Sequence, residues 1–245
     1  MMQPWAKMKM PALVALMLVL ASYVVFLEVQ ANGEPDDTIG PSAVWQPAQN
    51  QLTAIQYSCQ TRSQAYSECF VKLMADFGAS ADAVSFTRNY SDQNHGTVAF
   101  LNGFRPADVV DLGYGFFASG ADFNQRWLLL NGAPDIIDVD KLSLLPEDEM
   151  VKDPDYAALR QRYPRVALFE GDRSLDRTPK TEARPDGGQS FAVEYPLKDL
   201  CRACRVVGQA TFTFNFDADG ELLNVKFLKV AAARSESTKT RKKIR

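Results

Sequence analysis

Apolar and polar residues alternate most regularly in residues 195–230, the stretch around which we predict the fold to be built. The two apolar rows are Phe212, Phe214 and Phe216, and then Leu223, Val225 and Phe227. A two-residue period places one row of side chains on each face of a β-strand. Between the rows, residues 217–220 read Asp-Ala-Asp-Gly, which favours a turn. We therefore predict an antiparallel hairpin with one face in the core and with Lys226 and Lys229 near solvent.

Three segments carry apolar residues at the three- and four-residue steps of an amphipathic helix. The first covers residues 63–77, and a shorter one covers residues 83–90, with Ser80 and Asp82 as candidate N-caps. The third begins at Pro154, where Asp153 can cap the first turn. We expect these helices to cover a sheet.

Residues 97–140 change to short apolar runs separated by Gly, Asn and Pro, a pattern typical of β-strands. Asn131-Gly132 favours a hairpin turn because both residues accept positive φ. We therefore pair a strand at 127–130 with a strand at 136–139.

Residues 166–169 predict a further strand, whereas residues 170–189 predict a long charged loop without regular structure. Together these elements predict an α+β fold with two or three helices packed on a mainly antiparallel sheet. The whole forms a single domain at residues 51–230.

The N-terminal segment, residues 1–31, has the pattern of a signal peptide or signal anchor. Lys7 and Lys9 precede an uncharged apolar run, and small residues end at Ala31 before Asn32. Either interpretation predicts export, to the periplasm in a Gram-negative cell, and an uncleaved segment would tether the domain to the inner membrane.

Composition adds two flanking segments. Residues 32–50 predict a flexible linker, and residues 231–245 predict a disordered basic tail. The chain has a formal net charge of −3, but residues 32–233 carry 19 Lys and Arg against 28 Asp and Glu. This acidic body disfavours nucleic-acid binding by the folded domain, whereas the tail is a candidate for contact with anionic lipid.

The four cysteines, Cys59, Cys69, Cys201 and Cys204, favour disulfides in an exported chain. On one unbroken helix, Cys59 and Cys69 would lie ~15 Å apart, beyond the ~7 Å that a disulfide spans. We predict a local bond between Cys201 and Cys204 and a second bond between Cys59 and Cys69, with Cys59 in a loop that folds back on the helix. Zinc is disfavoured because a second close pair is missing and the chain has a single histidine, His95.

The spacing Cys201-x-x-Cys204 also has a redox interpretation. Arg202 and Arg205 would favour a thiolate and lower a thiol pKa. Such motifs usually open a helix after a strand, whereas this one leads into a β pattern, so a structural bond is favoured.

Other candidate motifs are incomplete. Asn215-x-Asp217-x-Asp219 imitates a calcium loop, but its twelfth position is Lys226 and its flanks are strands. The loose pattern Gly113-x-Gly115 has no convincing helix after it.

No marked nucleophile accompanies His95. The carboxylates Asp135, Asp138 and Asp140 are dense enough for a metal site or a hydrolytic pair, although a solvated strand end is favoured.

Three features together resemble uncharacterised envelope proteins of Gram-negative bacteria. They are the exported N-terminus, the pattern W-L-L-L-N-G-x-P-x-x-x-D-V-D at residues 127–140, and Y-P-L followed by C-x-x-C and a Phe-rich hairpin. The resemblance implies an envelope location and carries no catalytic residue.

The expected function is therefore that of a non-enzymatic, exported, envelope-associated binding or accessory protein, whose partner is an envelope protein or a small ligand. No cofactor, metal or catalytic residue is expected. The alternatives are a periplasmic thiol-disulfide oxidoreductase using Cys201 and Cys204, and a hydrolase using the acids of residues 135–140.

Overall fold

The computed structural model describes residues 38–60, 66–119, 122–171 and 178–233. Contacts divide the chain into two compact units, Met1–Thr38 and Ile39–Arg245, and every described helix and strand lies in the second. The predicted signal segment and most of the basic tail lie outside the described residues. Within the described residues, no helix is long and apolar enough to cross a membrane.

The predicted α+β class is confirmed, with two antiparallel sheets in place of one. The strands of the first sheet, in their order across it, are β1 (Val98–Arg105), β2 (Asp111–Ser119), β3 (Asp122–Leu130) and β4 (Ile136–Asp138). The predicted pairing of 127–130 with 136–139 is confirmed, because Leu130 lies opposite Ile136.

Glycine explains why the short apolar runs at residues 109–112 and 115–117 join in the single strand β2. A Cβ on Gly113 would lie 2.6 Å from a methyl carbon of Leu130 and 2.8 Å from one of Leu101. The strand continues through this residue because only glycine leaves room for these two buried leucines.

The second sheet contains the C-terminal hairpin. Its strands are β5 (Val166–Leu168), β6 (Lys180–Ala183), β7 (Gln189–Asp199), β8 (Val206–Phe216) and β9 (Leu222–Ala232). The order is β5-β7-β8-β9, and β6 pairs with β7. Residues 178–189, predicted as part of an irregular loop, thus include a strand. The first two residues of the predicted tail, 231 and 232, belong to β9.

The predicted hairpin is confirmed with one correction to its register. Phe212 and Phe214 lie opposite Phe227 and Val225, and Lys226 and Lys229 are exposed as expected. Two β-bulges interrupt β9. Because of the first bulge, Leu222 lies opposite Phe216, whereas Leu223, predicted in the apolar row, is 48% exposed.

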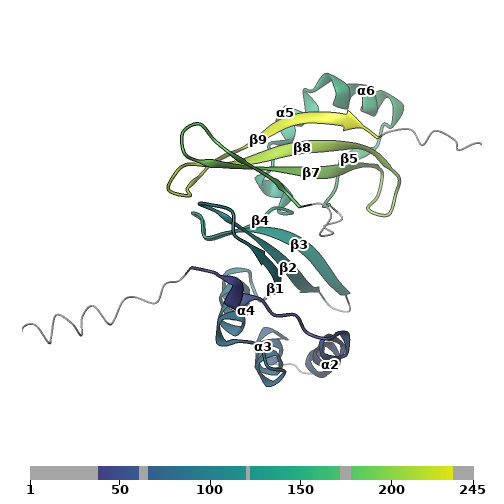
Figure 1. The fold of residues 1–245 in the computed structure, drawn as a ribbon. Coiled ribbons are helices and arrows are strands. Elements are labelled where there is room, and N and C mark those ends of the chain that lie inside the picture. The colour runs from purple at the N-terminus through teal and green to yellow at the C-terminus, as the bar shows by residue number, and fades with distance from the viewer. Residues whose placement is uncertain (1–37, 61–65, 120–121, 172–177, 234–245) are drawn as a thin grey trace, which may run out of the picture. The chain divides into compact units, whose positions relative to one another are not determined.

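Helices α2 (Gln49–Gln60), α3 (Tyr66–Asp76) and α4 (Ala81–Gln93) pack on the first sheet (Figure 1). The predicted cap of α4 is confirmed, because the Ser80 hydroxyl accepts a hydrogen bond from the Ala83 amide at 3.0 Å. Helix α2 was not predicted.

Part of the predicted linker packs against this sheet. The 3₁₀ helix η1 (Pro41–Ala43) precedes Val44, which forms a parallel bridge with Leu101. Trp45 is 7% exposed, and its ring lies 5.1 Å from that of Phe100. The described part of the linker therefore covers the free edge of β1, because an aromatic anchor and a backbone bridge hold it there.

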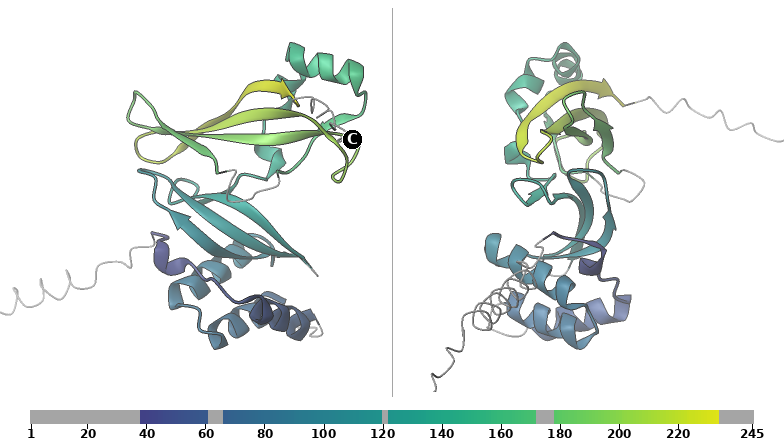
Figure 2. Two further views of the ribbon diagram at one scale, coloured as in Figure 1. Left: turned by 45° about the vertical axis from the view of Figure 1, so that its right-hand side comes forward. Right: turned by 60° about the vertical axis from the view of Figure 1, so that its left-hand side comes forward.

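The second sheet has helices of its own, α5 (Glu147–Val151) and α6 (Pro154–Arg162), which contact β9. A short 3₁₀ helix, η2 (Leu142–Leu144), leads into α5. The predicted cap of α6 is confirmed by bonds from the amides of Asp155 and Tyr156 to the Asp153 carboxylate. In the views of Figure 2, α2–α4 and α5–α6 lie at opposite ends of the described unit.

The largest core lies between the two sheets. Leu112, Trp127 and Leu129 of the first sheet join Tyr195 and Phe212 of the second in one buried cluster. The two sheets also share backbone hydrogen bonds, in which the Ala133 amide donates to Gly220 and the Leu222 amide donates to Ala133. The two sheets therefore share one hydrophobic core and direct backbone contacts.

Candidate functional site

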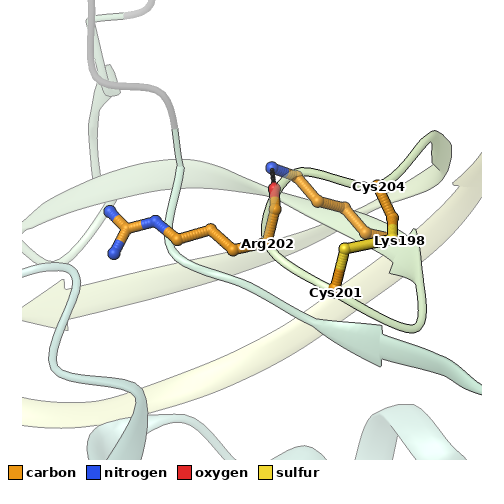
Figure 3. Close-up of a disulfide and its surroundings, with 4 residues drawn as sticks. All are labelled: Lys198, Cys201, Arg202 and Cys204. Atoms are coloured by element: carbon orange, nitrogen blue, oxygen red, sulfur yellow. Dashed lines mark hydrogen bonds between the residues drawn. A yellow bond between two sulfur atoms is a disulfide. The ribbon is translucent and has the colours of Figure 1, made fainter.

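A disulfide-closed loop at residues 199–205 connects β7 to β8. Its bond joins Cys201 to Cys204, as predicted, with 5.0 Å between the Cα atoms (Figure 3). The Cys204 amide also donates to the Cys201 carbonyl at 2.9 Å, so the four residues form a tight turn. Cys201 is exposed and Cys204 is half-buried.

Neighbouring strands hold this loop in place. The Asp199 amide donates to the Arg205 carbonyl at 3.2 Å, and the Leu200 amide donates to the Arg165 carbonyl at 3.1 Å. Arg165 immediately precedes β5, whose first residue, Val166, lies opposite Asp199. We call the surface formed by Arg165 and residues 198–207 the hairpin end.

The charged groups of Lys198 and Arg202 are engaged away from the sulfur atoms. Figure 3 shows the Lys198 ammonium donating to the Arg202 carbonyl, while the Arg202 guanidinium points away from the disulfide. That guanidinium lies 3.3 Å from the Glu170 carboxylate. The expected role of Arg202 in lowering a thiol pKa therefore has no support in its position, because a carboxylate engages it on the other side.

A line of ion pairs continues from Arg202 into the fold. Glu170 lies 3.8 Å from Arg126, and Arg126 lies 2.6 Å from Asp138. The Arg126 guanidinium also lies 4.8 Å from the centre of the Phe117 ring, a cation–π arrangement. The pairs thus connect an exposed loop residue to a carboxylate whose side chain is only 12% exposed.

We call Arg126 and Asp138 the inner pair, and burial acts in opposite directions on their two pKa values. Burial raises the pKa of Asp138, and the positive charge and hydrogen bond of Arg126 offset only part of that rise. Burial alone would lower the pKa of Arg126, but the negative charges of Asp138, Glu170 and Asp140 raise it. The contact with Arg126 therefore favours the charged form of Asp138, whereas burial disfavours it.

The three predicted acids do not converge on one site. Asp135 is exposed, Asp138 binds Arg126, and Asp140 is 3% exposed. The Asp138 carboxylate accepts from the Asp140 amide at 2.9 Å, and the Asp140 carboxylate accepts from the Gly171 amide at 3.3 Å. The favoured expectation of a solvated strand end is thus wrong for Asp138 and Asp140, because both are buried with partners. Within the described residues, no group of three potential ligands is placed to hold a metal.

The second predicted disulfide, Cys59–Cys69, is confirmed, with 5.6 Å between the Cα atoms. Cys59 lies on α2 and not in the loop that we predicted, and Cys69 lies on α3. The two cysteines could not bond on one unbroken helix. They bond here because they lie on two helices that pack together. Cys59 is 1% exposed and belongs to the core under the first sheet.

The remaining motifs take structural roles. Asp217 accepts hydrogen bonds from the amides of Asp219 and Glu221, so the calcium-like sequence forms the predicted hairpin turn. The Gly113 pattern lies inside β2, and His95 is exposed in the loop after α4.

A groove between α3 and α4 was not predicted. It encloses about 510 Å³, and its lining includes the charged residues Lys72, Asp76 and Arg88. Ser91 also lines it, is 2% exposed, and has no hydrogen-bond partner for its hydroxyl in the described residues. Charged residues at four-residue steps on α3 were visible in the sequence, but their position opposite α4 was not.

Comparison with protein-family models, with curated proteins and with solved structures finds no match to this chain.

Proposed function

We propose that this protein is a non-enzymatic, exported binding or accessory protein of the cell envelope, and that it contacts its partner through the hairpin end. The observation that carries the proposal is the composition of this surface. Leu200 is 51% exposed and Val206 is 39% exposed, beside the exposed side chains of Arg165 and Arg205. No carboxylate of the described residues forms an ion pair with either arginine. Exposed apolar and unpaired cationic side chains together are typical of a contact surface.

The contacts of Asp138 and Asp140 also favour a binding protein over a hydrolase. Asp138 is occupied by Arg126, and Asp140 accepts the Gly171 amide. A hydrolytic pair needs two carboxyl groups facing one open space, and these two are buried with partners inside the fold.

The cysteines support the proposed export. All four pair at disulfide distance, and the described residues contain no free thiol. Such bonds persist in oxidising compartments such as the periplasm. Alkylation of intact cells tests this directly: we expect four protected cysteines in the periplasmic fraction, and four reactive thiols in the cytosol would contradict export.

Photo-crosslinking of the full chain in its native host tests the proposed contact surface. Benzoylphenylalanine at position 200 should form adducts with an envelope component. Position 223 is a matched control, because Leu223 is 48% exposed but lies beside the β8–β9 turn. Equal adducts from both positions, or none from position 200, would contradict the proposal.

A thiol-disulfide oxidoreductase is the second candidate, favoured by the exposure of Cys201. An incoming thiolate would attack one sulfur of the bond, and the other cysteine would leave as a thiolate. Trapping distinguishes the candidates. If Cys204→Ala captures client proteins through Cys201, and Cys201→Ala does not, the oxidoreductase replaces the binding protein as the better account.

A further inference from the structure

The hairpin end gathers basic side chains from separate segments of the chain. Arg165 immediately precedes β5, Lys198 lies on β7, and Arg202 and Arg205 lie in the loop. Backbone hydrogen bonds of 3.1 and 3.2 Å hold these segments together. Of the two nearby acids, Glu170 pairs with Arg202 and Asp199 is half-buried. Four basic side chains thus stand against two acidic ones, which leaves this surface a local excess of positive charge on an otherwise acidic body.

An apolar side chain is held outward among these cations. Leu200 has a φ of +87°, in the left-handed region that non-glycine residues rarely adopt. It directly precedes the disulfide turn, and its amide is fixed to Arg165. This strained leucine leaves about half of its surface in water, 51% by exposure. Such strain is typical of a residue placed for a contact outside the fold.

The C-terminal strand ends at the same place. The Ala233 amide donates to the Val207 carbonyl at 2.9 Å, so the chain leaves the second sheet beside the loop. In the sequence, the twelve residues that follow contain six Lys or Arg and one Glu. The basic tail therefore begins at the hairpin end and not at a distant point of the domain.

We infer that the hairpin end docks on an anionic phospholipid bilayer, with the cations at the headgroup phosphates and with Leu200 and Val206 entering the interface. This inference rests on the proposed function and names its partner. The combination of charge and apolar surface favours a bilayer over a soluble polyanion. Anionic lipid attracts basic segments, and the interface also accepts apolar side chains, which a polyphosphate chain leaves in water.

The test uses the full chain carrying Leu200→Trp, with Leu223→Trp as the matched control. Each is mixed with vesicles of phosphatidylcholine alone or of phosphatidylcholine with phosphatidylglycerol. The readout is the difference in tryptophan emission from the wild-type protein, because the N-terminal apolar segment could itself bind any vesicle. We expect a blue shift, quenched by brominated lipid, from position 200 with anionic vesicles only and from position 223 with neither.

Charge variants test the electrostatic part of the inference. In the Leu200→Trp background, Arg165→Ala with Arg205→Ala should weaken the affinity for anionic vesicles, measured by the emission response, about 25-fold. This corresponds to roughly fivefold for each basic residue near an anionic surface. Arg165→Lys with Arg205→Lys should restore the affinity. Arg88→Ala with Arg105→Ala removes two exposed cations elsewhere and should leave the response unchanged. Circular dichroism checks that each variant is folded.

Two outcomes would overturn the inference. One is the same emission from position 200 with neutral and anionic vesicles. The other is a response to a soluble polyanion such as heparin without a response to anionic vesicles. The second outcome would leave the proposed function intact, because crosslinks from position 200 to an envelope component do not require lipid. Failure of both experiments would remove the proposed function as well.

Discussion

The two disulfides show how one kind of bond serves two different regions. Cys59–Cys69 joins α2 to α3, and Cys59 is buried in the core beneath the first sheet. Cys201–Cys204 closes an exposed turn between neighbouring strands. Among the described residues, no backbone hydrogen bond connects α2 to α3, so the first bond joins separate elements, whereas the second shapes a loop that the sheet already holds. We therefore assign stability to the helical disulfide and surface shape to the hairpin disulfide.

Removal of the helical disulfide should have the largest effect. In Cys59→Ala with Cys69→Ala, lost loop closure alone lowers the free energy of unfolding by about 3 kcal/mol. The truncation of Cys59, which is 1% exposed, adds to this loss. Urea unfolding followed by circular dichroism measures the change. A smaller loss than that caused by removing the hairpin disulfide would reverse the comparison.

Breaking the inner ion pair should have the next largest effect. Arg126→Met leaves the Asp138 carboxylate buried without its partner, and we expect a loss of about 2 to 3 kcal/mol, because the pair is mostly shielded from solvent. The control is Lys152→Met, whose pair with Asp148 is about three-quarters exposed. That change should stay within about 0.5 kcal/mol, and equal losses would contradict the assigned role of burial.

Removal of the hairpin disulfide should cost less. Cys201→Ala with Cys204→Ala opens a loop of only a few residues, so the free energy of unfolding should fall by no more than about 2 kcal/mol. If the bond shapes the contact surface, the free energy of binding to anionic vesicles, measured by emission at position 200, should fall by more than the free energy of unfolding does. An unchanged response would show that the turn keeps its shape without the bond.

Exposure should also separate the two bonds chemically. Cys201 is open to solvent, whereas Cys59 is not, so a small dithiol should reduce Cys201–Cys204 first. Alkylation at increasing times, followed by peptide mass spectrometry, measures the order. Simultaneous reduction of both bonds would indicate that the helical region opens as easily as the hairpin end.

The smallest expected effect is on the pH dependence of stability. The pKa of Asp138 in the folded state lies above its ordinary value because of burial. Between these two values the folded state holds a proton that the unfolded state has lost, so stability falls as pH rises through this window. Asp138→Asn should remove that fall, measured by urea unfolding at a series of pH values.

Asp186 gives the opposite sign and serves as a control. Its hydrogen bond with Arg184 and that with the Gly188 amide lower the pKa of this exposed carboxyl to about 2. Its contribution to stability is present above the ordinary pKa of an aspartate. It is lost as pH falls from there to the lowered pKa of the folded state. Asp186→Asn should therefore remove the loss of stability on the acidic limb, and a change in the slope of stability against pH near neutral pH would contradict the assignment.

Local chemistry made the hairpins and caps predictable. Alternating phenylalanines defined β8, and Ser80 and Asp153 cap the helices that they were predicted to cap. Helix α2 was missed because its inward residues, Leu52, Ile55 and Cys59, are spread thinly among polar neighbours. Their three- and four-residue spacing was a signal that could have been used.

Contacts between distant segments were not predictable. Nothing near Arg126 in the sequence indicates that it would meet Asp138 on the next strand and Glu170 far along the chain. The same holds for Trp45, whose burial depends on Phe100. For the hairpin end, the sequence supplied the cysteine pair and the basic tail. The position of the cysteine pair beside Arg165 and the exposed Leu200 depends on the pairing of β5, β7 and β8.

The two bulges in β9 bear on how copies of this chain behave at high concentration. β9 is the last strand of the second sheet, and a regular terminal strand is a template for aggregation. Each bulge breaks the spacing of the backbone donors and acceptors, while Lys226 and Lys229 add like charges. A second molecule would find no continuous ladder to extend, and fibril growth along this strand is disfavoured even with Leu223 and Leu228 open to water.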